Sequence, residues 1–471
     1  MLTVFQLVSY SRIRNNFPPG MIIAGVPVGG LSQQEAAQRL TQAYGVPVEL
    51  RYQDAIIQIK PALVGFNLDM TAMLAAADLQ RINQPFWSAF WAYLWGNLAK
   101  PEEVPLIATI SEDRLRSYLQ AEIAPRYDQP AAPAMPVVGS TNFSSGNPGT
   151  TLDLDRAVVL IKDALRSSSS RIVNLTYSRS TPPRPSFSVL TTMLKQVIDV
   201  DGFDGITEIY VKDLESGTEL NVAYEKGKDL QPDIAFTAAS TMKIPIMMTV
   251  YRHASEPTPQ SISDQMELMI RYSENGPADK LLQDVVDKNL GPLSVSNDLK
   301  ALGMQNTFLA GYFYPGAPLL QHFKTPANSR TDVNTSPDDY NQTTPTEMGM
   351  LLEDIYQCSE FGGGALTAVF GGEISQTECK QMITYLEMDR IGVLIQGGLP
   401  DGARVAHKHG WITDTDGYIH TIGDAAIVYS PRGNYILSIF MNHPTQLVWE
   451  SANLLFAKLS TAVYNYYNQN Q

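Results

Sequence analysis

The sequence predicts two mixed α/β (α+β) domains, the second built on an antiparallel sheet packed against a helical subdomain. The first observation is a proline-rich break at residues 178–186, where three prolines in four positions favour extended, non-helical backbone. The second is the order of elements after this break: a strand hairpin, a long helical stretch, then two strands and a helix. This order favours a single sheet that is assembled from both ends of the segment.

The break divides the 471 residues into segments of typical domain size. We expect a lead segment over residues 1–19, a smaller α+β domain over 20–177, a linker over 178–187 and a larger domain over 188–471.

The first domain shows helix and strand patterns in alternation. Ser32-Gln-Gln-Glu35 has the form of a capping box, which opens a helix through Leu40. Alternating apolar residues predict a pair of short strands over 48–59. A further helix is expected over 153–165, followed by a strand over 171–177.

The second domain is expected to open with a helix and a hairpin. Helical patterns then fill most of 240–395, and two strands and a helix close the chain. The ranges are 190–198 for the first helix, 208–212 and 219–222 for the hairpin, 424–429 and 435–441 for the closing strands, and 447–464 for the last helix.

Composition excludes several functions. With 34 Lys and Arg against 48 Asp and Glu, the formal charge is −14, which gives no general attraction to nucleic acid. No stretch of 18 apolar residues predicts a membrane span. The apolar residues 1–8 lack the features of a signal peptide, and we interpret them as the stub of an upstream membrane anchor.

Two cysteines are too few for a disulfide framework, and no CxxC or Cys/His cluster indicates a metal site. Cys358 and Cys379 are therefore either two unpaired core thiols or one local disulfide.

An aromatic stripe stands out in the first domain. Trp87, Trp91 and Trp95 are spaced by four residues and share one helical face, with Phe86 and Phe90 beside them. This face either packs in the domain core or makes an interfacial contact with a membrane or the cell wall.

Three short motifs in the second domain carry chemistry. In Ser240-Thr-Met-Lys243, the two side chains share a helical face, so the lysine amine can reach the serine hydroxyl and activate it. Ser273-Glu-Asn275 follows 33 residues after Ser240, and Lys408-His-Gly410 follows 168 residues after it.

This ordered set resembles the class A β-lactamases and penicillin-binding serine hydrolases over residues 190–465. The surrounding text is similar too, including Thr343-Thr-Pro-Thr-Glu-Met348, where Thr344 and Glu347 form a predicted capping box. The resemblance implies a β-lactamase-like fold and an acyl-enzyme mechanism that uses neither metal nor cofactor.

The resemblance also implies residue roles. Ser240 would be the nucleophile, Lys243 its proton acceptor, and Ser273 the group that passes a proton to the leaving nitrogen. Asn275 would hold the substrate amide and Lys408 would attract its carboxylate. The backbone N–H groups of Ser240 and Trp411 would form the oxyanion hole.

The sequence departs from the family pattern twice. His409 stands where the family has Thr or Ser, so an anchoring hydroxyl becomes an imidazole that titrates near neutral pH or merely fills the space. The family's β-lactamases carry an omega-loop Glu that activates the deacylating water, whereas residues 321–342 contain no Glu. Asp332, Asp338 and Asp339 are the stand-ins there. We therefore expect acylation with slow deacylation.

Residues 20–185 resemble a peptidoglycan-binding domain of bacterial cell-surface proteins, through 25–36, Gly65-Phe66 and 149–153. Together the resemblances imply a monomeric, extracytoplasmic protein of the bacterial cell envelope, secreted or membrane-anchored. It would act on β-lactams or D-Ala-D-Ala-type peptides of peptidoglycan. Two alternatives stay open: a catalytically weak wall-binding or structural module (a pseudoenzyme), and a small-ester hydrolase.

Overall fold

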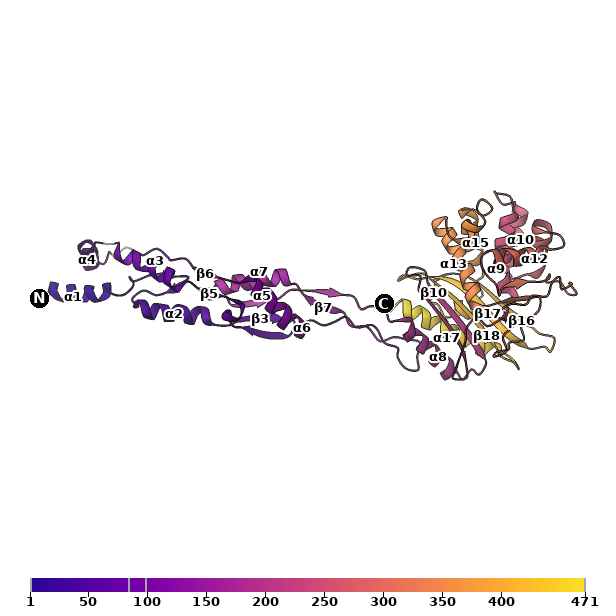
Figure 1. Cartoon of the computed structure of the whole chain (residues 1–471), viewed down its shortest axis with the longest axis horizontal. Coiled ribbons are helices and arrows are strands. Elements are labelled where there is room, and N and C mark those ends of the chain that lie inside the picture. The colour runs from indigo at the N-terminus through magenta and orange to yellow at the C-terminus, as the bar shows by residue number, and fades with distance from the viewer. Residues whose placement is uncertain (1, 84, 98–99, 470–471) are drawn as a thin grey trace. The chain divides into compact units, whose positions relative to one another are not determined.

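The computed structural model describes residues 2–83, 85–97 and 100–469. Its residues fall into two compact units. The first comprises residues 1–132 and 147–182, and the second comprises 133–146 and 183–471 (Figure 1). The division at 182–183 lies inside the predicted linker. Residues 133–146, which the sequence placed with the first domain, lie instead in the second unit, where Asn465 Nδ2 donates to the Thr141 carbonyl at 2.9 Å.

The first unit mixes helices with small sheets, as predicted. Ser32 caps helix α2 in a complete capping box with Glu35. The helices are α1 (Leu2–Arg14), α2 (Gln33–Gly45), α3 (Met70–Ile82), α4 (Phe86–Leu94), α5 (Glu112–Tyr118), α6 (Ala124–Tyr127) and α7 (Leu154–Arg166). The strands are β1 (Ile22–Ile23), β2 (Val26–Pro27), β3 (Val48–Tyr52), β4 (Ala55–Ile59), β5 (Asn67–Leu68), β6 (Ala108–Thr109), β7 (Gly149–Leu152), β8 (Ile172–Asn174) and β9 (Tyr177–Ser180).

The single strand predicted over 171–177 is wrong. It is two strands with different partners, because β8 runs parallel to β3 whereas β9 pairs antiparallel with β7.

Trp87 and Trp91 lie on α4, and Trp95 is its C-cap; of the two alternatives that the sequence left open, packing of this face in the core is wrong. The opposite side of α4 is buried, with Phe90 5% exposed against Tyr10 of α1. Trp87, Trp91 and Trp95 are 64%, 57% and 77% exposed. No helix among the described residues is long and apolar enough to cross a bilayer.

The second unit is built on a six-stranded antiparallel sheet in the order β12-β11-β10-β18-β17-β16, assembled from both ends of the segment as predicted. Its strands are β10 (Ile206–Asp213), β11 (Glu219–Glu225), β12 (Lys228–Leu230), β16 (Arg404–Thr413), β17 (Ile419–Tyr429) and β18 (Tyr435–Asn442). The short strands β13 (Phe236–Thr237), β14 (Phe308–Leu309) and β15 (Asn341–Thr343) form a separate sheet. The sequence patterns missed strand β16, which contains Lys408, and the short strands β12 to β15.

Helices cover both faces of this sheet (Figure 1). Alternation along β10 shows the two layers: Ile209 and Val211 pack with α8 (Phe187–Asp201) and α17 (Trp449–Tyr467), whereas Tyr210 faces the other core. That second core contains the helices α9 (Lys243–His253), α10 (Gln260–Arg271), α11 (Asn275–Leu281), α12 (Gly291–Ala301), α13 (Pro345–Phe361), α14 (Ala365–Val369) and α15 (Gln376–Leu386); α16 (Leu394–Gly397) lies against α17.

The predicted capping box of α13 forms only in part. Thr344 Oγ1 accepts from the Glu347 N–H at 3.2 Å, but the Glu347 carboxylate turns away from the cap. It accepts from Thr307 Oγ1 at 2.6 Å and from the Asn306 N–H at 2.9 Å. The Glu347 carboxylate therefore bonds to donors from another part of the chain instead of the Thr344 N–H of the capping box. Sequence spacing could not show this.

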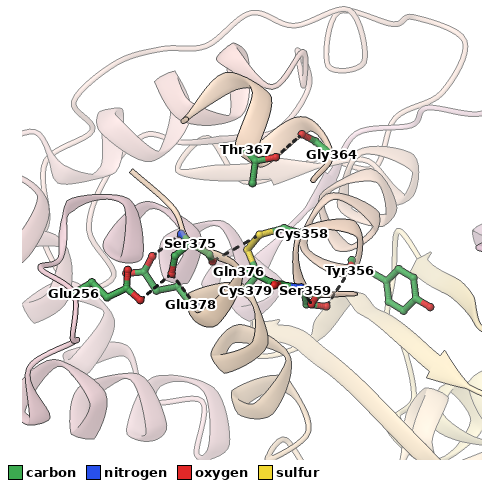
Figure 2. Close-up of a disulfide and its surroundings, with 10 residues drawn as sticks. All are labelled: Glu256, Tyr356, Cys358, Ser359, Gly364, Thr367, Ser375, Gln376, Glu378 and Cys379. Atoms are coloured by element: carbon green, nitrogen blue, oxygen red, sulfur yellow. Dashed lines mark hydrogen bonds between the residues drawn. A yellow bond between two sulfur atoms is a disulfide. The ribbon is translucent and has the colours of Figure 1, made fainter. Parts of the chain in front are cut away.

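A disulfide joins the two cysteines and links α13 to α15 (Figure 2). Cys358 and Cys379 are both fully buried, and the N-cap of α15, Ser375, forms a capping box with Glu378 beside them. Of the two alternatives that the sequence left open, the structure has the disulfide.

Removing this bond should destabilise the second unit. The closed loop spans 21 residues, and a loop of that length corresponds to about 3 kcal/mol of chain entropy in the unfolded state. We expect Cys358→Ser/Cys379→Ser to lower the free energy of unfolding by about that amount in urea denaturation. A reducing agent should do the same to the parent and nothing to the double variant. Equal stability of parent and variant would contradict the expectation.

Candidate active site

Ser240 lies in a short 3-10 helix, Ala239–Met242, which follows β13 and leads into α9. The preceding residue, Ala239, has φ of 47°, a left-handed conformation that is strained for a residue with a Cβ. Asn341 of β15 holds it there, since its Oδ1 accepts from the Ala239 N–H at 2.7 Å. The turn leaves Ser240 half-buried rather than enclosed.

Lys243 brings three of the predicted residues together. Its fully buried amine lies 2.8 Å from Ser240 Oγ, 2.5 Å from the Ser273 carbonyl oxygen and 2.9 Å from Asn275 Oδ1. Ser273 Oγ is also close, at 3.3 Å. Ser273 comes from the loop between α10 and α11 and has φ of 57°, so a second strained residue borders the nucleophile.

The environment of Lys243 favours a neutral amine. Burial, and after it the positive charge of Lys408, lower its pKa to about 7. A neutral amine has two N–H groups, which can donate to the carbonyl oxygens of Ser273 and Asn275. Its lone pair then remains for the hydroxyl proton of Ser240, as a general base requires.

Strand β16 is the edge of the sheet and packs against the Ser240 turn. A Cβ on Gly410 would lie 2.8 Å from the Ser240 nitrogen, so this close approach requires glycine. The backbone N–H of His409 points away from the neighbouring strand and donates to Asp389 Oδ2 at 3.3 Å. Because alternate N–H groups of a strand face the same edge, the Trp411 N–H faces that edge too. The assignment of the oxyanion hole to the N–H groups of Ser240 and Trp411 stays a prediction.

Asp389 is the residue that the sequence analysis missed. Its buried carboxylate accepts from Lys408 Nζ at 3.0 Å and from His409 Nδ1 at 2.8 Å. Burial opposes ionisation of Asp389, but the His409 hydrogen bond and the Lys408 charge outweigh it and lower its pKa to about 2. Asp389 follows α15 with no motif around it, so only the folded chain reveals the pairing.

His409 is engaged by its own neighbours in the folded chain. Its imidazole is bonded to Asp389 and stacks on the Trp411 ring, with centroids 4.6 Å apart. Burial lowers the pKa of His409, although the hydrogen bond with Asp389 acts in the opposite direction. On the same side of the strand, His407 lies against Asp424 at 3.0 Å.

The three aspartates of residues 321–342 differ in their surroundings. Asp332 is more than half exposed and pairs with Arg330. Asp338 is more enclosed: its Oδ2 accepts from Asn341 Nδ2 at 3.3 Å, which connects it to Ala239 through Asn341. Burial raises the pKa of Asp338. The neighbouring charge of Asp339 raises the pKa of Asp338 further.

No metal site accompanies this arrangement, since the described residues contain no group of three or more His, Cys, Asp or Glu side chains that could hold an ion. The chemistry available in the described part of the chain is a serine hydroxyl, a neutral amine beside it, a second hydroxyl, and backbone donors at the sheet edge.

Residues 255–467 match the beta-lactamase enzyme family. The match includes Ser273, Asn275 and Lys408, and begins after Ser240 and Lys243. No curated protein matches the chain. The match supports the general class that the motifs indicate, a β-lactamase-like serine hydrolase. The peptidoglycan-binding resemblance of residues 20–185 has no such support and stays a prediction.

Three solved structures are similar to part of the chain. PBP-A is 20% identical with a TM-score of 0.42, over 61% of this chain and 99% of its own. A class A β-lactamase representing the last common ancestor of Gram-negative bacteria is 19% identical with a TM-score of 0.41, over 58% and 97%. A β-lactamase from Desulfarculus baarsii DSM 2075 is 16% identical with a TM-score of 0.43, over 60% and 98%.

Acylation of Ser240 should increase as the pH rises through about 7, because only neutral Lys243 can accept the hydroxyl proton. We expect Lys243→Arg, which keeps its charge, to lower the rate at least ~10²-fold. Stopped-flow acylation by a fluorescent penicillin from about pH 5 to 9 measures both. A flat profile in the parent protein would contradict the assignment.

Asp389→Asn should destabilise the fold, because it leaves the buried Lys408 ammonium without a counter-charge. We expect a loss of about 3–5 kcal/mol at neutral pH in urea denaturation. The folded pKa of Asp389 lies below its unfolded value, so this contribution is present above about pH 4 and is lost as the pH falls towards 2. The gap between parent and variant should therefore shrink below pH 4. Asp416→Asn, on the exposed turn after β16, is the control, and an equal loss there would refute the pairing.

Proposed function

We propose that the second unit is a serine acyl-transfer hydrolase that acts on β-lactams or acyl-D-Ala-D-Ala-type cell-wall peptides through a covalent ester at Ser240. The observation that carries the proposal is the Lys243 amine, which is buried, has a pKa lowered to about 7 and lies 2.8 Å from the Ser240 hydroxyl. A pair placed only for packing has no reason to bury a lysine there.

Acylation then follows from the contacts. Ser240 Oγ attacks the substrate carbonyl carbon while its proton moves to Lys243 Nζ. The N–H groups of Ser240 and Trp411 stabilise the negative charge that develops on the carbonyl oxygen. The C–N bond breaks as Ser273 Oγ donates its proton to the leaving nitrogen, and Lys243, 3.3 Å away, returns a proton to Ser273.

Deacylation requires a base that activates water, and residues 321–342 offer a weak one. Asp332 is occupied by Arg330, and the carboxylate of Asp338 is already engaged by Asn341 and the Tyr340 N–H. These contacts support slow deacylation and a long-lived acyl-enzyme, as in a penicillin-binding protein.

Lys408 should attract a substrate carboxylate less strongly than the motif alone implies. The ammonium of Lys408 is fully buried and already bonded to Asp389, so part of its charge is neutralised. This pairing favours weak recognition of anionic substrates and keeps small neutral esters as the second candidate.

An extracytoplasmic location is part of the proposal. The Cys358–Cys379 disulfide supports it, because such bonds persist in oxidising compartments. Binding of peptidoglycan by the first unit and action as a monomer complete the proposal.

The intact mass of the full chain after incubation with penicillin G tests this function. We expect one stable adduct on the parent protein that carries the whole mass of the drug, because ring opening releases no fragment. Ser240→Ala should show none. Ser261→Ala, an exposed serine of α10, is the matched control and should be labelled like the parent.

The other outcomes separate the alternatives. Consumption of the drug without an adduct would indicate fast turnover and contradict slow deacylation. An intact drug with no adduct, together with hydrolysis of p-nitrophenyl acetate that Ser240→Ala abolishes, would favour the ester hydrolase. Inactivity in both assays would favour a binding module without catalysis.

A further inference from the structure

Helices α1 and α4 form a small element with its own aromatic cluster (Figure 1). Tyr10 of α1 contacts the rings of Phe86, Phe90 and Tyr93, with centroids 5.2–5.5 Å apart. Tyr93 Oη donates to Gln6 Oε1 at 3.3 Å. The two helices are therefore fixed to each other by their inner faces.

This element is also attached firmly to α3. The Arg81 guanidinium, at the end of α3, donates to the carbonyl oxygens of Arg14 and Asn15 at 3.1 and 3.2 Å. These carbonyls at and just after the end of α1 have no partner within the helix, so the arginine satisfies them. The outer face of the element is thus held in a fixed position on the first unit.

The outer face of α4 is apolar and exposed. Trp87, Trp91 and Trp95, which we call the tryptophan face, are 57–77% exposed. On α1, Phe5 and Val8 share a helical face and are 71% and 48% exposed. Exposed apolar clusters of this kind mark contact sites rather than ordinary surface.

The segments that carry this face are basic, although the chain is acidic as a whole. Residues 1–34 and 79–101 contain no Asp or Glu, whereas they contain Arg12, Arg14, Arg81 and Lys100. The chain as a whole carries −14. Arg81 pairs with Asp78, while the side chains of Arg12 and Lys100 are exposed. The exposed tryptophans therefore lie on segments of the chain that carry basic residues and no acidic ones.

We propose that the tryptophan face docks this protein on the surface of an anionic lipid bilayer. Tryptophan has an apolar ring body and one N–H, which suits the boundary between headgroups and acyl chains. The backbone of α4 is helical, so its polar groups are already paired and can enter that boundary at little cost. Neighbouring basic side chains add attraction to anionic headgroups.

The composition of α4 argues against a glycan as the occupant. Sugar recognition needs side-chain donors and acceptors around the aromatic rings, yet α4 has Ser88 as its one polar side chain besides the rings' own groups. The exposed aliphatic and phenyl groups of α1 fit acyl chains and not sugar hydroxyls. Net positive charge disfavours pairing of this surface with a second copy of itself.

The test is binding of the full chain to vesicles of phosphatidylcholine with about 30% phosphatidylglycerol, measured by co-sedimentation. We expect binding that Trp87→Ser/Trp91→Ser/Trp95→Ser weakens by roughly tenfold or more. Ile56→Ser/Leu63→Ser/Val159→Ser removes three apolar side chains of similar exposure from elsewhere on the first unit and should bind like the parent.

A measurement on the parent protein avoids any folding defect of the variants. Brominated lipids should quench tryptophan fluorescence on binding, because the tryptophan face would lie among the acyl chains. We assign the quenching to this face because Trp411 and Trp449 pack on each other in the second unit and are less exposed. Absence of sedimentation or of quenching would overturn the proposal. So would a tryptophan-dependent dimer without lipid, or tryptophan-dependent sedimentation with purified peptidoglycan in place of vesicles.

Discussion

The arrangement of the second unit depends on the burial of one amine. Lys243 loses its water shell in the core between the sheet and the helices, and this loss is the main reason that its pKa falls to about 7. The surrounding structure supplies what water no longer can, through the Ser273 and Asn275 oxygens. The same desolvation that costs folding free energy therefore creates the base beside Ser240.

A second buried charge limits what that base can act on. Lys408 is held by Asp389 at the edge of the sheet, and its remaining charge contributes to the low pKa of Lys243. Strengthening this ion pair would weaken the pull on an anionic substrate, and breaking it would leave a charge unpaired in the core. In the proposed mechanism, Lys408 thus links activation of the nucleophile to recognition of a carboxylate.

Backbone strain is placed where the chemistry is proposed. Ala239 and Ser273 both adopt left-handed conformations, on either side of the Ser240–Lys243 pair. Asn341 supports the first because its Oδ1 accepts from the Ala239 N–H, and the Lys243 amine supports the second by donating to the Ser273 carbonyl oxygen. Removal of either support would release strain and move the reacting atoms, so these contacts serve position as much as stability.

The sequence by itself determined the α+β class, the sheet built from both chain ends, a few of the helices and the three motifs, because these depend on local periodicity and on spacing along the chain. It could not determine that Asp389 meets Lys408, or that Glu347 leaves its cap for Thr307, since such partners are distant in sequence and are selected by charge and burial. The sequence also could not show that the tryptophan face is exposed. Helical spacing shows which residues share a face, and only the packed fold shows which face is covered.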